Sequence, residues 1–317
     1  MAILYLMKNI VIIGGGLSGL AESCYLAKNK FNVLLIDKNS GPGGRLSSFN
    51  EGGFIFDLGP TWYWMPEIFE KFFSDFNKDL SDYYSLKRLD PSYKFFLPNS
   101  EFDIPVNINE LYSVFEKVEK GSSKKLEQFM KQAKEKYKIS MDQFLYLPNH
   151  SIKEYISLRM VKYILTLDLF KSLRRHIKSF FKNKIIRDLL EFPSMFLGGT
   201  PNNTPALYSL MNYADIIGGT WYPDGGMGKV SDGFAKLSTE LGVKHIYNEE
   251  IIDLDIVNGS IQCAISKNQN RYKADVFLCC AEYPFVQMNL LSDKYRTYNE
   301  KYWSKKKVAP SALIFYL

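Results

Sequence analysis

The stretch IVIIGGGLSGLAESCYLAKNKFNVLLIDKNSGPGGRLSSF, residues 10–49, decides the fold of this chain. It opens with a short apolar run and a cluster of three glycines, and a second glycine cluster before an arginine comes near its end. An apolar run of this length between turn signals is typical of a buried parallel strand, so residues 9–13 are predicted to be the first strand. Residues 18–28 then predict a helix and residues 31–37 a second strand. Together they make a βαβ unit of about 30 residues.

Three glycines after the first strand, Gly14, Gly16 and Gly19, have the spacing of a dinucleotide-binding turn. The first allows a tight bend, the second lets the backbone approach a pyrophosphate, and the third lets the helix pack closely on the strand. The free amides and the helix dipole favour an anion there. Asp37 ends the second strand, where its carboxylate can bind ribose hydroxyls and disfavours the 2′-phosphate of NADP. An ordinary strand-to-helix turn with a solvated aspartate is the plain alternative.

The segment after Asp37 favours FAD over NAD. Residues 41–45 read GPGGR, and residues 56–61 read FDLGPT. Glycines let the backbone pass close to a cofactor, and the forked guanidinium of Arg45 suits phosphate oxygens. NAD-dependent dehydrogenases have no need of glycines repeated at this point, so we expect FAD as the cofactor. A plain turn is the alternative for GPGGR.

The rest of the chain reads as a helix-rich insert followed by strands. Residues 63–106 read as rich in loops. Residues 109–137, with an interruption at 121–123, read as helical, as do residues 152–192 and 228–241. The strands expected after them are residues 245–247, 251–257, 260–266 and 274–280. Asn258 and Gly259 signal a hairpin turn. We therefore predict an α/β protein: a Rossmann-like FAD-binding domain with a parallel sheet, interrupted by a helix-rich second domain. The resemblance and the basic segment described below imply that this second domain is substrate- and membrane-associated. The first domain takes residues 7–90 and 226–290, and the second takes residues 91–225 and 291–317.

The composition is that of an ordinary globular protein, with 46% hydrophobic residues, 23% charged residues and a net charge of +6. No run of 18 apolar residues is present, so no helix is expected to cross a bilayer. The four cysteines lack the spacing of metal ligands, so we expect reduced thiols in a cytoplasmic protein and no metal site. The basic residues are not part of a recognised nucleic-acid-reading module, so no nucleic-acid partner is expected.

The motifs, taken in order, resemble those of the FAD-dependent amine-oxidase-like flavoproteins and, within them, the bacterial-type phytoene desaturases. The resemblance is carried over nearly the whole chain by IVIIGGGLSGL, LLIDKNSGPGGR, GFIFDLGPT, TWYPDGGMGKVSDGF and KADVFLCCAEYPFV. FDLGPTWYWMPEIFEKFF and GGTPNNTPALYSLMNYAD narrow it to carotenoid desaturases. The resemblance implies desaturation of a long polyene, phytoene, in which FAD accepts a hydride that no side chain can take.

The resemblance also implies roles for individual residues. Those that would contact FAD are Gly14, Gly16 and Gly19 at the pyrophosphate, Asp37 and Lys38 at the adenosine, Gly44 and Arg45 at the diphosphate and ribityl chain, Gly59, Pro60 and Thr61 at the isoalloxazine, and Ile251 at the adenine. Lys30 departs from the family, which often has glycine in that helix-to-strand turn.

The catalytic acid or base stays open. Glu154 lies roughly where relatives carry a candidate carboxylate, although a solvated helix glutamate is the favoured explanation. Asp224 and Asp232 are the other candidates for the acid or base. Asp224 is more simply explained as a turn-forming residue, and Asp232 as a residue on a helix surface. The three histidines have no serine or aspartate at a suggestive spacing, so none is assigned a catalytic role.

A basic amphipathic segment, residues 170–183, predicts contact with a membrane surface. On a helix its apolar side chains fall within about 100° of arc: Phe170, Leu173, Ile177, Phe180 and Phe181. Its cations form a separate stripe: Lys171, Arg175, Lys178 and Lys182. Residues 159–187 carry nine Lys or Arg and one acid, Asp168. A helix lying in a membrane interface has this pattern, and a core helix with a solvated basic face is the alternative.

Members of the family are longer, and ALIFYL at residues 312–317 reads as the first strand of a further part. The chain is therefore expected to be a fragment that binds FAD poorly and lacks activity as it stands. The open alternatives are another carotenoid desaturase, an isomerase or ketolase of the same fold, and an inactive flavin- or lipid-binding remnant. A more distant alternative is an amine oxidase, in which the aromatic residues of TWYWM, residues 61–65, could surround an amine substrate. No oligomeric state is assigned.

Overall fold

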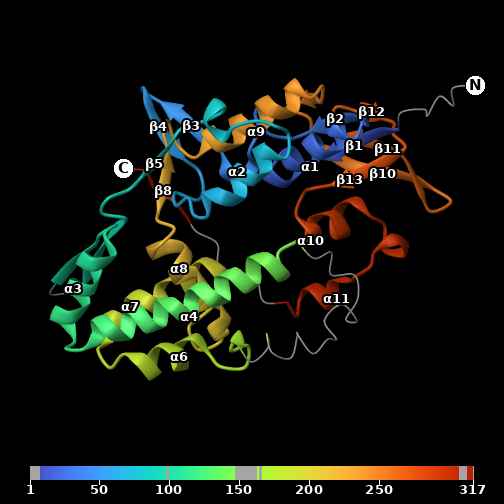
Figure 1. Ribbon diagram of the computed structural model, residues 1–317. Helices are drawn as coiled ribbons and strands as arrows, with labels where there is room; N and C mark the ends of the chain where they lie inside the picture. Colours follow the sequence, from blue (N-terminus) through green and yellow to red (C-terminus); the bar gives the residue numbers. More distant parts are fainter. Residues whose placement is uncertain (1–7, 98–99, 147–162, 164–165, 307–312, 317) are drawn as a thin grey trace, which may run out of the picture.

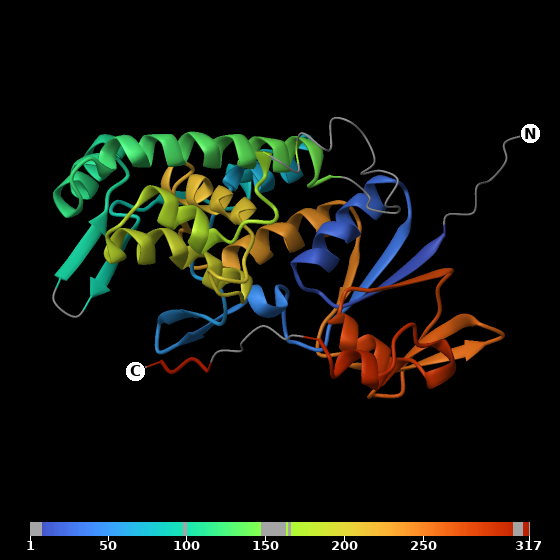
Figure 2. The same cartoon turned by 90° about the horizontal axis from the view of Figure 1, so that it is seen from below.

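A computed structural model describes residues 8–97, 100–146, 163, 166–306 and 313–316 of the chain. Figures 1 and 2 show two parts side by side: one holds the parallel sheet with helices α1 and α9, and the other is a group of helices around α4.

A four-stranded sheet forms the centre of the first part. Its strands lie in the order β13 (Val276–Cys279), β1 (Asn9–Ile13), β2 (Asn32–Ile36) and β9 (Lys244–Ile246), and each neighbouring pair is parallel. Both central strands are nearly continuous apolar runs because both faces of the sheet are covered. The predicted α/β fold with a parallel sheet is confirmed.

The two faces of β1 contribute to two separate apolar cores. Ile10 and Ile12 pack toward α1 (Leu17–Lys28) and α9 (Gly228–Glu240). Val11 and Ile13 pack toward the antiparallel strands β10 (Ile251–Val257) and β11 (Ser260–Ser266) and toward the short helix η6 (Val286–Leu290). Side chains alternate along a strand, so four consecutive residues of β1 serve both cores.

The hairpin predicted between β10 and β11 is present. The strands pair antiparallel, and Asn258 and Gly259 between them have φ angles of 51° and 80°. Positive φ at both central residues is the geometry of the tight turn that such pairs favour. A third strand, β12 (Arg271–Tyr272), continues this sheet.

The interpretation of residues 63–106 as rich in loops is wrong. They contain α2 (Pro66–Ser74), η2 (Leu80–Asp82), β5 (Leu86–Arg88), and a hairpin of β6 (Tyr93–Leu97) and β7 (Ser100–Ile104). Pro66 occupies the first turn of α2, where the missing amide proton costs nothing. β5 pairs antiparallel with a distant strand, β8 (Trp221–Pro223). Ahead of this region, β3 (Ser48–Glu51) and β4 (Phe54–Asp57) form another hairpin.

The second part is helical and has its own core. It contains α3 (Ile108–Val118), α4 (Ser122–Gln143), α6 (Leu173–Phe180), α7 (Lys184–Glu191), η4 (Phe192–Leu197), η5 (Ala206–Ser209) and α8 (Leu210–Ile216). Residues 109–137, predicted to be helical, are divided into α3 and α4 by residues 119–121. The prediction of one helical stretch over residues 152–192 is wrong in its described part, because α6 and α7 are separate and Asn183 caps the second. The boundaries of the two predicted domains stay predictions.

The apolar stripe predicted to face lipid faces the protein interior instead. Leu173, Ile177 and Phe181 have no exposed area. The ring of Phe181 lies 6.1 Å from the ring of Phe115, and Leu173 and Ile177 belong to the same core. Of the five apolar residues only Phe170, 94% exposed, lies open to solvent, and it precedes the helix.

The C-terminal residues differ from the prediction as well. After α10 (Tyr283–Phe285) come η7 (Asp293–Tyr295) and α11 (Glu300–Trp303). Residues 313–316 form no strand, because no neighbouring strand pairs with them. The ring of Tyr316 instead packs against Phe49 and Phe56, at centroid distances of 5.4 and 5.1 Å.

Candidate cofactor site

The turn between β1 and α1 has no room for side chains at two of its three glycines. Gly14 has a φ of +112°, a region that favours glycine, and a Cβ there would lie 3.0 Å from the backbone nitrogen of Ala281. A Cβ on Gly19 would overlap the carbonyl oxygen of Gly14. Gly16 is different, since a Cβ there would meet nothing within 4 Å. The backbone at Gly16 therefore opens onto free space.

That free space belongs to a cavity of about 540 Å³ at the carboxyl ends of the sheet strands. In open α/β sheets ligands bind at this edge. Seven of the eleven residues predicted to contact a cofactor line it: Gly14, Gly16, Asp37, Lys38, Gly44, Arg45 and Ile251. The other four do not, namely Gly19, Gly59, Pro60 and Thr61.

Asp37 is fastened to the glycine turn. Its side chain is buried, Oδ2 accepts a hydrogen bond from the Gly15 amide at 2.6 Å, and Oδ1 accepts one from the Asn39 amide at 2.7 Å. Each carboxylate oxygen can accept a second bond. The carboxylate therefore keeps acceptor capacity toward the cavity while its position is fixed.

The second glycine cluster touches the first. The Gly43 amide donates to the carbonyl of Gly15 at 2.9 Å, and Gly43 forms a β-bridge with Gly16. Gly43 and Gly44 have φ angles of +110° and +56°, and a Cβ on Gly44 would lie 3.4 Å from the Cα of Gly16. The two clusters thus form one surface of bare backbone.

Close packing requires a glycine at position 59. A Cβ there would overlap the carbonyl oxygen of Arg45, so the FDLGPT segment lies directly on the backbone of GPGGR. The neighbouring Leu58 amide donates to the Ser47 carbonyl at 2.9 Å. Pro60 and Thr61 are exposed.

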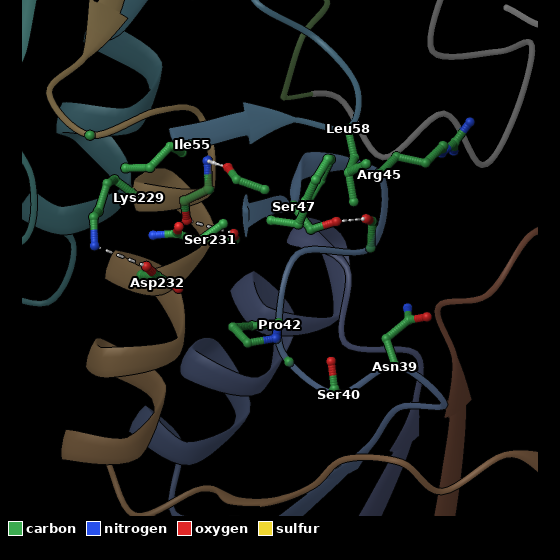
Figure 3. Close-up of a pocket in the computed structure, with 17 residues that line it drawn as sticks. Asn39, Ser40, Pro42, Arg45, Ser47, Ile55, Leu58, Lys229, Ser231 and Asp232 are labelled. Atoms are coloured by element: carbon green, nitrogen blue, oxygen red, sulfur yellow. Dashed lines mark hydrogen bonds and ion pairs between the residues drawn. The ribbon is translucent and has the colours of Figure 1, made fainter. Parts of the chain in front are cut away.

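A second cavity, of about 720 Å³, adjoins the first (Figure 3). Both are lined by Asn39, Gly44 and Arg45, so they meet at the second glycine cluster. The far wall comes from the β3–β4 hairpin and the start of α9, with Ile55, Leu58, Lys229, Ser231 and Asp232. Asp232, considered as a catalytic candidate, forms an ion pair of 3.5 Å with Lys229. Asp224, its rival, is exposed in the turn that follows β8.

Asp57, for which the sequence predicted no role, joins two of the quoted motifs. Its Oδ1 accepts from Ser48 Oγ at 2.9 Å and from the Met227 amide at 2.8 Å, and its Oδ2 accepts from the Tyr222 hydroxyl. The carboxylate therefore holds FDLGPT against the YPDGGMG turn. The signal was the aspartate inside a glycine-bearing motif, but two of its three partners, Tyr222 and Met227, lie more than 160 residues away.

Three carboxylates of the 540 Å³ cavity were also missed: Glu249, Glu250 and Glu282. Hydrogen bonds from Ser266 and Asn270, with others from Asn268 and Tyr272, lower the pKa of Glu249 to about 2. All three carboxylates follow the strands β9 and β13, so the rule that ligands bind at the carboxyl ends of parallel strands could have found them.

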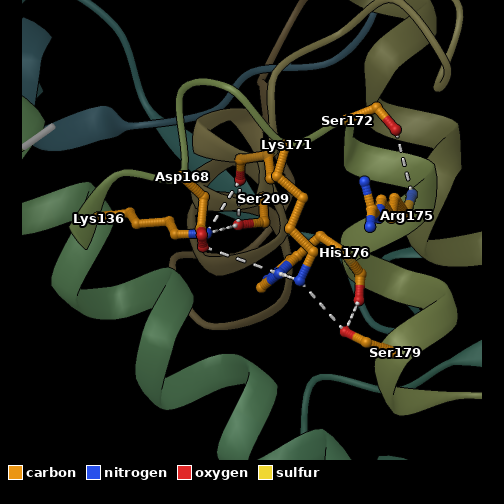
Figure 4. A network of polar contacts seen from close by, with 9 residues as sticks. Lys136, Asp168, Lys171, Ser172, Arg175, His176, Ser179 and Ser209 are labelled. Carbon is orange, nitrogen blue, oxygen red and sulfur yellow. Dashed lines mark hydrogen bonds and ion pairs between the residues drawn. The ribbon is translucent and has the colours of Figure 1, made fainter. Parts of the chain in front are cut away.

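A polar network in the helical part is separate from these cavities (Figure 4). Lys136 on α4 is buried, and its Nζ lies 2.9 Å from Asp168 Oδ2, 3.2 Å from the Ala206 carbonyl and 3.3 Å from Ser209 Oγ. Burial lowers the pKa of His176 beside it to about 4. The three partners use all the protons of the Lys136 ammonium, so the network fastens α4 to η5 and to the segment before α6.

The remaining predicted features concern metals, membrane spans and one carboxylate. In the part of the chain that the structure describes, no cluster of His, Cys, Asp and Glu is suited to hold a metal ion. Among the same residues no helix is both long and apolar enough to cross a bilayer. Glu154 lies outside the described residues.

Comparison with known proteins agrees with this architecture. A family described as NAD(P)-binding Rossmann-like domain matches residues 12–78. The chain is 34% identical to a carotenoid 3,4-desaturase of Haloarcula japonica over 98% of its length and 63% of that protein. It is 29% identical to a zeta-carotene-forming phytoene desaturase of Myxococcus xanthus over 98% of its length and 60% of that protein.

Among solved structures, an engineered putrescine oxidase is similar with a TM-score of 0.59 and 15% identity. The match covers 91% of this chain and 61% of that one, and at this identity it shows the fold alone. The chain thus spans about three fifths of the length of the proteins it matches.

Proposed function

Because this chain is a relative of the carotenoid desaturases, we propose that it forms the FAD-binding part of an oxidoreductase that desaturates a carotenoid-type polyene. FAD binding is proposed for the chain itself, with the weak affinity predicted from its sequence. Desaturation is proposed only for a protein of the relatives' full length, because this chain spans about three fifths of that length. Phytoene is the specific substrate proposed, although the two relatives differ in their named reactions, a 3,4-desaturation and the formation of zeta-carotene.

The adjoining cavities support a flavin dinucleotide. The adenosine diphosphate is assigned to the 540 Å³ cavity, with its pyrophosphate at Gly16, its ribose at Asp37 and its adenine at Ile251. The rest of the cofactor would run past Gly44 and Arg45 toward the 720 Å³ cavity. The matched Rossmann-like region, residues 12–78, covers the nucleotide turn that NAD and FAD enzymes share, so it favours neither cofactor.

Each residue of the site has a task that its geometry allows. FAD, when bound, supplies the acceptor for the hydride removed from a saturated carbon. Asp37 accepts from ribose hydroxyls through the lone pairs that Gly15 and Asn39 leave free. Arg45 is exposed at the junction of the cavities and brings a permanent positive charge to phosphate oxygens.

A cytoplasmic location at a membrane surface is part of the proposal, because such hydrocarbons reside in lipid. The features that support contact with a membrane are the exposed cations Arg175, Lys178 and Lys182 and the exposed Phe170 at the start of the segment. The apolar stripe of α6 plays no part in it, since that stripe is core.

The observation that carries the proposal is the contact between the two glycine clusters at the mouth of both cavities. Its test is a titration of the chain with FAD, NAD⁺ and NADP⁺ separately, followed by flavin fluorescence or by calorimetry. We expect FAD to bind more tightly than either nicotinamide dinucleotide by at least about ten-fold. Equal or tighter binding of NAD⁺ would overturn the choice of flavin. Product analysis after expression in a phytoene-forming host then distinguishes desaturation from isomerisation or ketolation.

A further inference from the structure

Two tryptophans that follow the FDLGP segment lie on one face of the chain. Tyr63 between them is 2% exposed, and its backbone nitrogen and oxygen bond the oxygen and nitrogen of Trp221 at 3.2 and 2.9 Å. Successive side chains of extended backbone point to opposite faces. Trp62 and Trp64 therefore share the face opposite Tyr63, and both are half-buried.

These two rings form a cluster with two phenylalanines of η4, which we name the aromatic ledge: Trp62, Trp64, Phe192 and Phe196. The centroid of the Trp62 ring lies 5.7 Å from Trp64, 5.6 Å from Phe192 and 5.2 Å from Phe196. The border of the ledge is open to solvent, with Phe196 49% exposed and Met195 beside it 65% exposed.

Polar atoms at the ledge are turned inward and held. Trp64 Nε1 donates to Thr220 Oγ1 at 3.1 Å, and that hydroxyl donates to Asp215 Oδ1 at 3.0 Å. Tyr93 stacks near Trp62 at 4.7 Å and donates its hydroxyl proton to Asp215 Oδ2 at 2.8 Å. Asp215 is 1% exposed. The hydrogen bonds orient the rings and leave apolar ring surface outward.

We propose that the aromatic ledge is the surface against which the unsaturated hydrocarbon of the substrate lies, with Trp62, Trp64 and Phe196 as its contact residues. The inference rests on the proposed function and adds to it the place of the substrate. Thr61 directly precedes the ledge, and Gly59 packs on the backbone of Arg45, which lines both cavities. A hydrocarbon on the ledge would therefore lie next to the junction of the two cavities, where the cofactor is proposed to pass.

The chemistry of the ledge fits a polyene better than a charged ligand. A conjugated hydrocarbon is flat and uncharged, so ring stacking and release of water are the contacts it can make. A cationic amine could also contact the ring faces, but the carboxylate behind the rings, Asp215, is buried and both of its oxygens already accept bonds, so it gives such a ligand no ion pair. Exposed rings gathered in this way are costly in water and mark a binding surface.

The test measures retention of a C40 carotene, supplied in mixed detergent micelles, by the immobilised full chain through the visible absorption of the carotene. Phe196→Ser is compared with a matched control, Phe54→Ser, because both phenylalanines are exposed, 49% and 71%, and Phe54 lies outside the ledge. We expect F196S, and the double variant W62A/W64A, to weaken retention at least about ten-fold. F54S should stay within about two-fold of the unchanged chain.

FAD titration of the same variants separates the two proposals. Unchanged FAD affinity with lost carotene retention supports the ledge and shows that the variants are folded. If the double variant does not fold, F196S alone decides, since its side chain is half in solvent. Carotene retention equal in F196S and F54S, or no retention by a chain that binds FAD, would overturn the ledge and leave the cofactor proposal standing. If the unchanged chain retains carotene on the ledge but binds NAD⁺ or NADP⁺ as tightly as FAD, the proposed flavin cofactor is overturned and the ledge stands.

Discussion

The Gly15 amide donates a hydrogen bond to Asp37 Oδ2 over 2.6 Å, so the carboxylate that ends β2 is attached to the turn that ends β1. Asp37→Ala leaves that buried amide without its partner, which costs about 1–3 kcal/mol of the free energy of unfolding. It also removes the ribose acceptor, so we expect FAD affinity to fall at least about ten-fold. Urea unfolding and FAD titration measure the two effects. Asp232→Ala, on an exposed ion pair in the neighbouring cavity, should change stability by less than about 1 kcal/mol.

Gly16 and Gly19 should respond oppositely to the same substitution. Gly16→Ala adds a methyl group into open space at a φ of −69°, so stability should change by less than about 1 kcal/mol while FAD affinity drops. Gly19→Ala forces a methyl group into the Gly14 carbonyl and should cost more than about 2 kcal/mol. FAD affinity that G16A leaves unchanged would contradict an approach of the pyrophosphate to Gly16.

Asp215 makes stability depend on pH. Burial raises the pKa of this carboxyl to about 6, although hydrogen bonds from Tyr93 and Thr220 oppose the shift. Because the folded pKa lies above the ordinary value of 3.8, the stabilising contribution is complete below pH 3.8 and is lost as the pH rises through about 6.

The uncharged variant Asp215→Asn does not suffer this loss. Relative to the unchanged chain, its free energy of unfolding should therefore gain about 3 kcal/mol between pH 4 and pH 7. Urea unfolding at several pH values measures the difference, and Asp224→Asn, at an exposed turn position, should track the unchanged chain. Parallel curves for D215N and the unchanged chain would contradict the raised pKa.

Lys30 carries a backbone conformation that favours glycine, with a φ of 68°. Lys30→Gly relieves that strain, and we expect the free energy of unfolding to rise by up to about 1 kcal/mol in urea unfolding. Asn29→Gly, one residue earlier at a φ of −85°, has no such strain to relieve and should lower it. A loss of stability in K30G would show that the contacts of the lysine side chain stabilise the fold by more than the strained backbone at this position costs.

Exposed cations beside Phe170 should govern contact with anionic membranes. Replacing Arg175, Lys178 and Lys182 by glutamine removes about 1 kcal/mol of attraction per charge near the surface, so binding to phosphatidylserine vesicles should weaken strongly at low salt. The matched control replaces Lys131, Lys134 and Lys138, three exposed cations of α4. If both triple variants lose vesicle binding equally in a sedimentation assay, the net charge of the protein governs binding, and this surface has no special role.

The βαβ unit and its glycine turn could be predicted because their signals are local. The apolar run of β1, the spacing from Gly14 to Gly19 and the position of Asp37 all lie within one short segment. α2 was missed because Pro66 was taken as a loop residue, whereas proline also fits the first turn of a helix. The lipid face of residues 170–183 was wrong because an apolar stripe looks the same whether it meets lipid or a protein core.

Other features depend on partners far away in the chain. Asp57 gains its role from Tyr222 and Met227, and Trp64 is oriented through Thr220. No local pattern announces such a pairing. The residues predicted at the isoalloxazine, Gly59, Pro60 and Thr61, line neither cavity, and their role stays a prediction.

The pairing of β5 with β8 has a consequence for the architecture as a whole. Leu86 lies opposite Pro223 and Arg88 opposite Trp221, and the Leu89 amide continues the ribbon by bonding the Thr220 carbonyl. Residues 89–220, with the described helices around α4, therefore leave and rejoin the nucleotide-binding part at two adjacent strands. An insertion held at one such ribbon can change in length or shape while the sheet and its glycine turns need not be rebuilt.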